Sequence, residues 1–146
     1  MTQNGKSGFR RAIAGTASIE FALLAIPFFM LSIGIFEVCR ALWTQEALQE
    51  SVTQGARCIG VHQTDCYSAG VYSATGTTAY VQNVATGWGI SVPTADITPT
   101  QSANCGGVAG FAKITIAYNF STVAGSLIPS FSNVPLAAKA CFPNNP

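Results

Sequence analysis

The sequence predicts an α+β fold in which a long N-terminal helix packs on a small antiparallel sheet. Three observations support this prediction. An apolar run extends from about Thr16 to Phe36, apolar residues then recur mostly at spacings of three and four as far as Gly60, and strand-like segments follow Gly89. The chain has 146 residues, which is enough for one modest domain beside the helix.

The apolar run predicts a membrane-spanning helix. It covers residues 16–36, of which 21–36 carry no charge, and at about 1.5 Å per residue it spans roughly 31 Å, about one hydrocarbon core. A buried core helix is the alternative, but it would leave the basic start of the chain unexplained. No small-residue cleavage site follows the run, so we expect the helix to stay on the protein.

Basic residues precede the run and set its expected orientation. Lys6, Arg10 and Arg11 lie in a stretch without any acidic residue. Because basic flanks stay on the cytoplasmic side of a membrane, we expect the C-terminal part to be exported. The predicted organisation is a basic leader at 1–15, a transmembrane and assembly helix at 16–36, and an exported stem with a small α+β domain at 37–146.

Glu20 is the one acidic residue within the apolar run. A carboxylate in a membrane helix costs about 2.5–3.5 kcal/mol at the helix centre and less near its end, so such a residue usually has a partner. If the chain were cut after Gly15, the new amine of Thr16 would lie four residues before Glu20, on the same helix face. The amine of a neighbouring subunit is a second candidate partner. A simple acid at the membrane surface is the third interpretation.

The pattern remains helical from Glu37 to Gly60, where it predicts an amphipathic stem whose apolar positions include Val38, Leu42 and Leu48. Pro93 and Pro99 are expected to end extended segments. The elements predicted after Gly60 are a loop to Cys66, a weak helix at 67–87, extended segments at 90–92 and 95–98, a hairpin connection at 101–110, and strands at 112–120 and 134–142.

Four of the five cysteines, Cys58, Cys66, Cys105 and Cys141, lie in the part expected to be exported. In an oxidising compartment an even set of cysteines predicts disulfides, and four allow three pairings. We favour Cys58–Cys66 with Cys105–Cys141, because the first pair could close a short turn. Cys39 would then be the unpaired thiol.

The segment 15–21, which reads Gly-Thr-Ala-Ser-Ile-Glu-Phe, resembles the prepilin-peptidase site of type IVb pilins: a glycine, four residues, a glutamate and an aromatic residue. More narrowly, residues 17–27, 34–37 and 47–57 resemble the N-terminal motif of the TadE/TadF-like pseudopilins. These proteins belong to the bacterial tight-adherence (Flp) pilus machinery. The resemblance covers about residues 10–60.

This resemblance implies a pilin-like fold and a role for each matching residue. Gly15 would be the last residue of a leader removed by a prepilin peptidase, and Thr16 would be the mature N-terminus. Glu20, followed by the aromatic Phe21, would match the acid needed for subunit recruitment. The implied function is that of a minor pilin in the bacterial inner membrane. The implied partners are the peptidase, other pilins or pseudopilins, the inner-membrane assembly platform and membrane lipid.

Other functions find little support in the sequence. The net charge of +1 gives no footprint for nucleic acid. His62 lies between Cys58 and Cys66, but an exported location favours a disulfide over zinc there. No catalytic set, metal site or cofactor motif can be named. The alternative to a pilin is a membrane-anchored periplasmic binding module with no pilus role.

Overall fold

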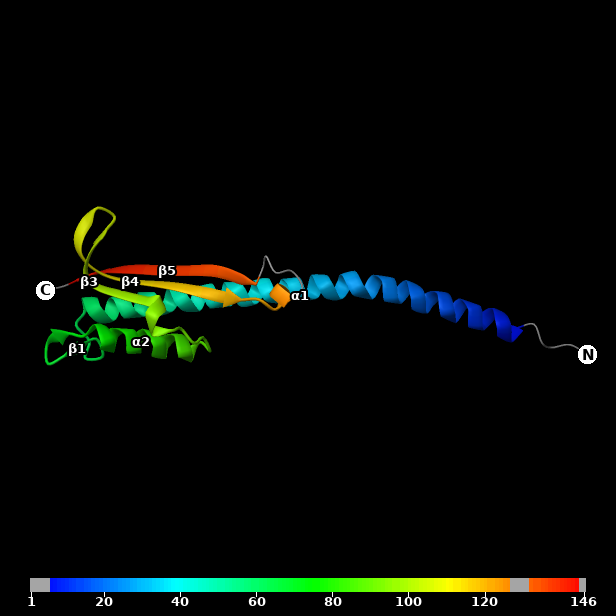
Figure 1. Ribbon diagram of the computed structural model, residues 1–146, viewed down its shortest axis with the longest axis horizontal. Helices are drawn as coiled ribbons and strands as arrows, with labels where there is room; N and C mark the ends of the chain where they lie inside the picture. Colours follow the sequence, from blue (N-terminus) through cyan, green and yellow to red (C-terminus); the bar gives the residue numbers. More distant parts are fainter. Residues whose placement is uncertain (1–5, 127–131, 145–146) are drawn as a thin grey trace, which may run out of the picture. The chain divides into compact units, whose positions relative to one another are not determined.

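The computed structural model describes residues 6–126 and 132–144, and the chain divides into two compact units, Met1–Val38 and Cys39–Pro146. The predicted α+β class, a long helix with a small antiparallel sheet, is confirmed (Figure 1). The elements in chain order are α1 (Lys6–Gly60), β1 (Tyr67–Ser68), β2 (Val71–Tyr72), α2 (Ala74–Gly87), the 3-10 helix η1 (Thr94–Asp96), β3 (Ile97–Cys105), β4 (Val108–Ser121), the 3-10 helix η2 (Val123–Ser126) and β5 (Asn133–Pro143).

The first unit consists, over its described residues, of the N-terminal part of α1. The helix continues through Pro27. A proline removes one backbone hydrogen bond, and membrane helices tolerate it because neighbouring groups can satisfy the freed carbonyl. Because residues 16–36 all lie within α1, the helical prediction for the apolar run is confirmed.

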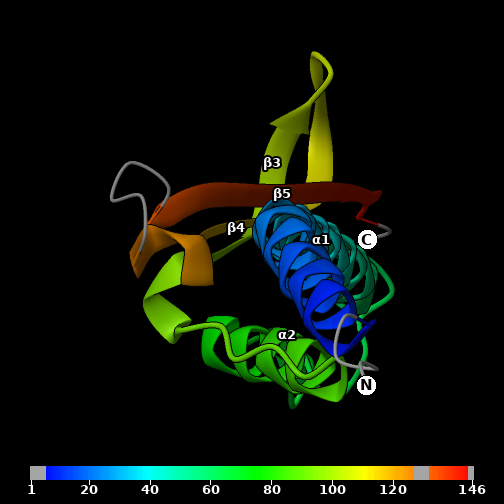
Figure 2. The ribbon, with the colours of Figure 1, turned by 90° about the vertical axis from the view of Figure 1, so that its right-hand side faces the viewer.

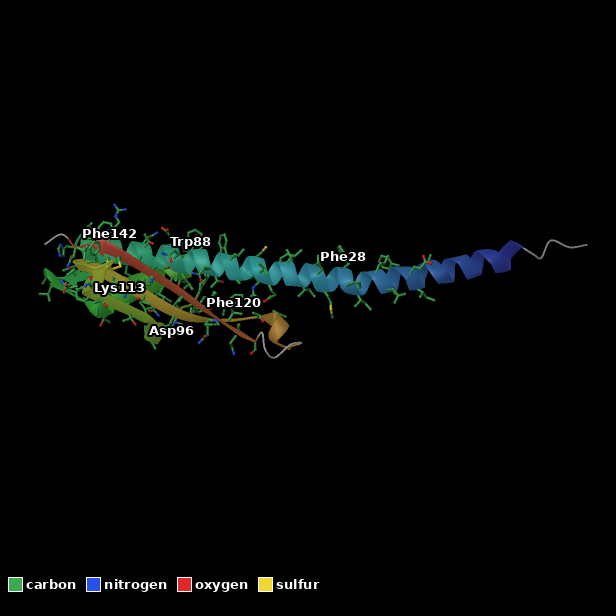
Figure 3. The ribbon with its side chains drawn as sticks, turned by 90° about the horizontal axis from the view of Figure 1, so that it is seen from above. Phe28, Trp88, Asp96, Lys113, Phe120 and Phe142 are labelled. Carbon is green, nitrogen blue, oxygen red and sulfur yellow. A yellow bond between two sulfur atoms is a disulfide. The ribbon has the colours of Figure 1, made fainter. Side chains whose placement is uncertain are left out.

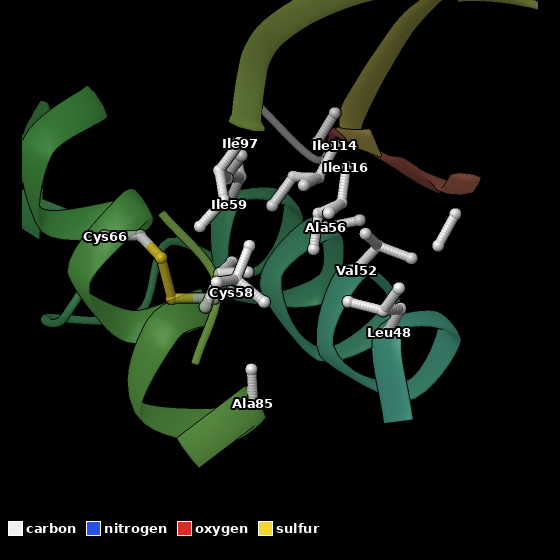
Figure 4. Packing of buried hydrophobic residues seen from close by; sticks show 14 of the residues in the cluster. Leu48, Val52, Ala56, Cys58, Ile59, Cys66, Ala85, Ile97, Ile114 and Ile116 are labelled. Atoms are coloured by element: carbon white, nitrogen blue, oxygen red, sulfur yellow. A yellow bond between two sulfur atoms is a disulfide. The ribbon is translucent and has the colours of Figure 1, made fainter. Parts of the chain in front are cut away.

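The second unit is built in layers around the part of α1 that starts at Cys39. An antiparallel sheet of order β3-β4-β5 lies on one side of α1 and α2 lies on the other (Figure 2). Figure 4 shows the core between these layers, where apolar side chains from all three meet. Fully buried members include Leu48, Val52, Ala56 and Ile59 from α1, Val81 and Ala85 from α2, and Ile114 and Ile116 from β4.

The stem prediction is correct from Leu48 to Ile59 and wrong for two earlier positions. Val38 is 60% exposed and Leu42 is 62% exposed. Gln45, which interrupts the apolar pattern, has a structural role of its own. Its Nε2 donates to the Ala137 carbonyl at 3.0 Å.

A second glutamine repeats this contact one turn later. Gln49 Nε2 donates to the Lys139 carbonyl of β5 at 3.2 Å. Since β5 pairs only with β4 in this sheet, its other edge carries unpaired carbonyls. The two glutamines of α1 therefore donate hydrogen bonds to two of the carbonyls at that edge, and these bonds link the helix to β5.

The strands differ from the prediction at their boundaries. The predicted strands at 112–120 and 134–142 lie within β4 and β5, which pair from Phe111↔Pro143 to Ser121↔Asn133. The hairpin connection predicted at 101–110 is present, but its bounds are wrong, because β3 extends to Cys105 and β4 begins at Val108. Only Gly106 and Gly107 form the turn, with φ of +61° and +87°. Two adjacent residues with positive φ make the tight hairpin turn that glycine permits.

Pro99 and the segment 90–92 also depart from the prediction. Pro99 does not end a strand but lies inside β3, opposite Ile114. An edge strand accommodates proline, because the missing N–H faces away from the ladder. Residues 90–92 are not a strand, and Gln82 Nε2 donates to the Val92 carbonyl at 2.8 Å. That bond joins this connection to α2.

Only residues 74–87 of the predicted helix at 67–87 are helical. Ser73 caps α2, and its hydroxyl accepts from the backbone N–H of Gly76 at 3.1 Å. Before the cap, β1 and β2, which are each two residues long, pair as an antiparallel hairpin. Ala69 and Gly70 at its turn have φ of +51° and +77°. A left-handed turn and a serine cap together prevent the helix from starting earlier.

The structure contains two disulfides, Cys58–Cys66 and Cys105–Cys141, which is the pairing that the sequence favours. The first closes the turn after α1, with Cα atoms 6.0 Å apart. The second joins the end of β3 to β5, with Cα atoms 6.5 Å apart. Cys39 is a free, exposed thiol. Each bridge restricts the unfolded chain and should stabilise the fold by roughly 2–4 kcal/mol.

Thiol counting tests this arrangement. When the full chain is denatured without reductant, an alkylating reagent should modify one cysteine of the five, Cys39, and all five after reduction. Intact mass gives the number of adducts. Cys39→Ser is the control and should take up no reagent without reductant. More than one adduct on the unreduced wild-type chain would contradict the two bridges.

Gly55 tests the packing between the layers. A Cβ at this position would lie 2.5 Å from Ile114 Cδ1 and 2.5 Å from Val81 Cγ2. Gly55→Ala should therefore lower the free energy of unfolding by about 1–2 kcal/mol, since overpacking exceeds the gain in helix propensity. Urea denaturation of the full chain in detergent micelles measures the change.

Gly87→Ala is the matched control for that substitution. A Cβ at Gly87 would meet nothing within 4 Å. The control should leave stability unchanged or raise it by up to about 1 kcal/mol. Equal stability of the two variants would show that the layers do not approach closely at Gly55.

Candidate functional site

The residues that the sequence singles out lie along the first unit's part of α1. Gly15 and Thr16 belong to its helical backbone, and Glu20 and Phe21 follow in the next turn. A spacing of four residues places positions 16 and 20 on one helix face. The structure therefore brings the candidate processing and assembly positions together on one continuous helix.

Apolar side chains cover this helix on all sides. Every large hydrophobic residue from Ile19 to Phe36 is exposed, from 48% at Ile33 to 74% at Phe21. Phe28 projects outward from the helix in Figure 3. Apolar exposure on this scale marks a surface that lipid or another protein covers. The helix from Ala17 onward is also apolar and long enough to cross a membrane.

Ser32 and Glu20 are polar residues within the apolar run, and their surroundings differ. Ser32 Oγ donates to the Phe28 carbonyl at 2.9 Å, so its hydroxyl is satisfied within the helix. Glu20 is exposed, and no described residue forms an ion pair with it. In an apolar environment a carboxylate without a partner is costly. Glu20 is therefore the side chain of this helix that most needs a group from outside the described chain.

A shallow apolar groove of about 590 Å³ begins one residue after Glu20. It is lined by Phe21, Leu24, Ala25, Phe28 and Phe29. The rings of Phe28 and Phe29 meet edge to face, with centroids 5.8 Å apart. Ala25 is the small residue among these large ones, and small residues allow a second helix to approach closely. Glu20 and the groove together form a surface suited to helix packing.

The distal end of the second unit holds a different concavity of about 480 Å³. It is lined by His62, Thr64, Tyr67, Ala69 and Gly70. The His62 and Tyr67 rings meet edge to face with centroids 4.4 Å apart. Burial raises the pKa of the nearby Tyr72 phenol above its ordinary value. No nucleophile–base pair is present among the residues described at this end.

Cys58 and Cys66 form the disulfide that the sequence favours over a zinc site with His62. Both cysteines are bound in their disulfide, and a thiolate ligand must be free. Within residues 6–126 and 132–144, no group of three or more His, Cys, Asp or Glu side chains could hold a metal ion.

One pair of exposed residues was missed by the sequence analysis. Trp43 of α1 and Trp88 after α2 meet edge to face, with ring centroids 5.4 Å apart. Tryptophan shortly after a membrane span is a known signal for the membrane–water interface. That signal was available for Trp43, but its contact with Trp88 depends on the tertiary fold.

An exposed apolar helix and a helix packed on a small antiparallel sheet are consistent with a pilin-like fold, and the described residues hold one helix apolar and long enough to span a membrane. The family model described as TadE, TadE-like protein, matches residues 15–57. Over that segment the chain is similar to TadE-like proteins, which is consistent with an association with the Tad pilus system. Searches among the curated proteins and among the solved structures found no match.

Proposed function

We propose that this chain is a minor pilin, or pseudopilin, that takes part in assembly of a Flp-type adherence pilus. It would be made as a precursor and cut after Gly15 by a prepilin peptidase. The observation that carries the proposal is Glu20, an exposed acid in an exposed apolar helix, five residues after Gly15 and inside the TadE-like segment.

The helix would serve first as an anchor in the inner membrane. The basic residues Lys6, Arg10 and Arg11 would hold the leader, residues 1–15, in the cytoplasm. The second unit would then lie in the periplasm. The two disulfides of that unit support an oxidising compartment.

The same helix would then become a packing surface. Cleavage after Gly15 creates a positive amine at Thr16, which can pair with Glu20 of the same chain or of a neighbour. This pairing would lower the cost of holding the Glu20 carboxylate in lipid. The groove next to Glu20 offers the apolar contact that a neighbouring helix needs.

A second candidate function is a membrane-anchored periplasmic binding module. The concavity beside His62 and Tyr67 favours it, because its aromatic and polar lining could contact a small ligand. In that case the helix is a plain tether and Glu20 has no part in function.

The N-terminal mass of the mature chain tests the processing step. In cells with an active prepilin peptidase, the protein should begin at Thr16. Gly15→Leu should prevent this cleavage, because the leucine side chain would enter a peptidase site shaped for glycine. Gly8→Leu, the same change within the leader, is the control and should be cleaved normally. A mature wild-type chain that still begins at Met1 would contradict the proposal.

The charge of Glu20 tests the assembly step. Glu20→Gln keeps the shape of the side chain and removes its charge, so it should lower incorporation into sheared pilus fractions about tenfold or more. The chain should remain in the membrane fraction. Glu46→Gln, at an exposed acid of the second unit, should assemble normally. Normal assembly of Glu20→Gln would instead support the plain tether of the binding module.

A further inference from the structure

The feature that neither the family nor the proposed function accounts for is the pair of tryptophans. Trp43 is 57% exposed and Trp88 is 41% exposed. Trp43 Nε1 donates to the Trp88 carbonyl at 3.4 Å, so the two residues are held together by a hydrogen bond as well as by ring contact. Large aromatic rings exposed in a fixed arrangement mark a surface that another phase or molecule covers.

The position of Trp43 along the chain suggests what covers the pair. Trp43 follows Phe36, the last residue of the apolar run, by seven helical residues, which rise about 10 Å. Helical side chains lean toward the N-terminus, so the indole reaches back toward the apolar run. The headgroup layer on each side of a bilayer is about 5–8 Å thick. This sequence distance after a membrane span is typical of tryptophans at the membrane–water interface.

The fold brings Trp88 to the ring of Trp43. It follows the last residue of α2, and its backbone N–H donates to the Ala85 carbonyl at 3.0 Å. In Figure 3 the labelled side chain of Trp88 lies beside α1. Two segments 45 residues apart in sequence thus present one aromatic surface.

Arg40 places a positive charge close to Trp43 on α1. It lies three residues before Trp43, about 4.5 Å nearer the apolar run along the helix, so the two residues are neighbours on the helix surface. Its guanidinium carbon is 5.2 Å from the centroid of the Phe120 ring of β4. A guanidinium can bind lipid phosphate while it stacks on an aromatic ring. Tryptophan and arginine are the residue types that anchor proteins at membrane–water interfaces.

We propose that Trp43 and Trp88 form a docking surface for the headgroup layer of the bilayer. The indole rings would lie in the headgroup layer, where an indole has lipid on one side and water on the other. Because the rings come from α1 and from the end of α2, lipid contact would hold the second unit in one orientation about the helix axis before assembly. This inference rests on the membrane anchorage in the proposed function and does not depend on the pilus role.

Intrinsic fluorescence tests the docking directly, because the chain contains only two tryptophans. The full chain is reconstituted in phosphatidylcholine vesicles whose acyl chains are brominated either near the headgroup or near the chain end. Emission should be blue-shifted relative to the denatured chain. It should be quenched at least twofold more by bromine near the headgroup than by bromine near the chain end. Aqueous iodide should quench it several-fold less than it quenches the denatured chain.

Single variants assign the signal to each ring. Trp43→Phe and Trp88→Phe each leave one indole, and both should retain quenching by the headgroup-side bromine. The control is Val108→Trp in a chain that carries both phenylalanine substitutions. Val108 is 59% exposed in the β3–β4 hairpin. Its tryptophan should be quenched by iodide and not by brominated lipid.

Flotation of the vesicles distinguishes loss of the membrane anchor from loss of the docking surface. A chain that does not float with the vesicles has no membrane anchor, which would overturn the proposed function together with this inference. A chain that floats, but whose emission is insensitive to brominated lipid and open to iodide, would overturn the docking surface alone. Emission that shifts only as the protein-to-lipid ratio rises would also overturn it, because a neighbouring copy would then cover the tryptophans.

Discussion

The close approach of α1 to both the sheet and α2 is the constraint on which the second unit depends. At Gly55 the helix meets Ile114 on one side and Val81 on the other, with no room for a methyl group. A helix buried on two faces needs small residues where the layers come nearest. The sheet has one face to cover and α2 has one stripe to bury, and the same segment of α1 serves both.

The other contacts of this unit make that arrangement unique. The glutamines at 45 and 49 fasten α1 to the free edge of β5, so the helix cannot slide along the sheet without losing two hydrogen bonds. The disulfide between Cys105 and Cys141 links the outer strands β3 and β5. The disulfide between Cys58 and Cys66 links the last turn of α1 to the segment that follows it. Core packing and the two disulfides therefore favour the same position of α1 against the sheet.

The first unit has the opposite physical problem. From Ile19 to Phe36 its helix exposes every large hydrophobic side chain, so its stability must come from lipid or from other helices. This requirement connects the fold to the proposed role. A surface that lipid covers in the membrane can be covered by neighbouring subunits in a fibre, and Glu20 is the polar group that would distinguish the two environments. The TadE-like match at residues 15–57 falls on this helix and its continuation.

The sequence by itself determined the long helix, the apolar run and two of the three long strands, because each depends on local periodicity and composition. It also pointed to Gly15 and Glu20 through spacing along one helix. Tertiary structure alone decided that Leu42 is exposed, that Pro99 can lie inside a strand, and that Trp43 meets Trp88. The physical reason is that burial, edge position and ring contact are set by partners far away in the chain, about which local pattern carries no information.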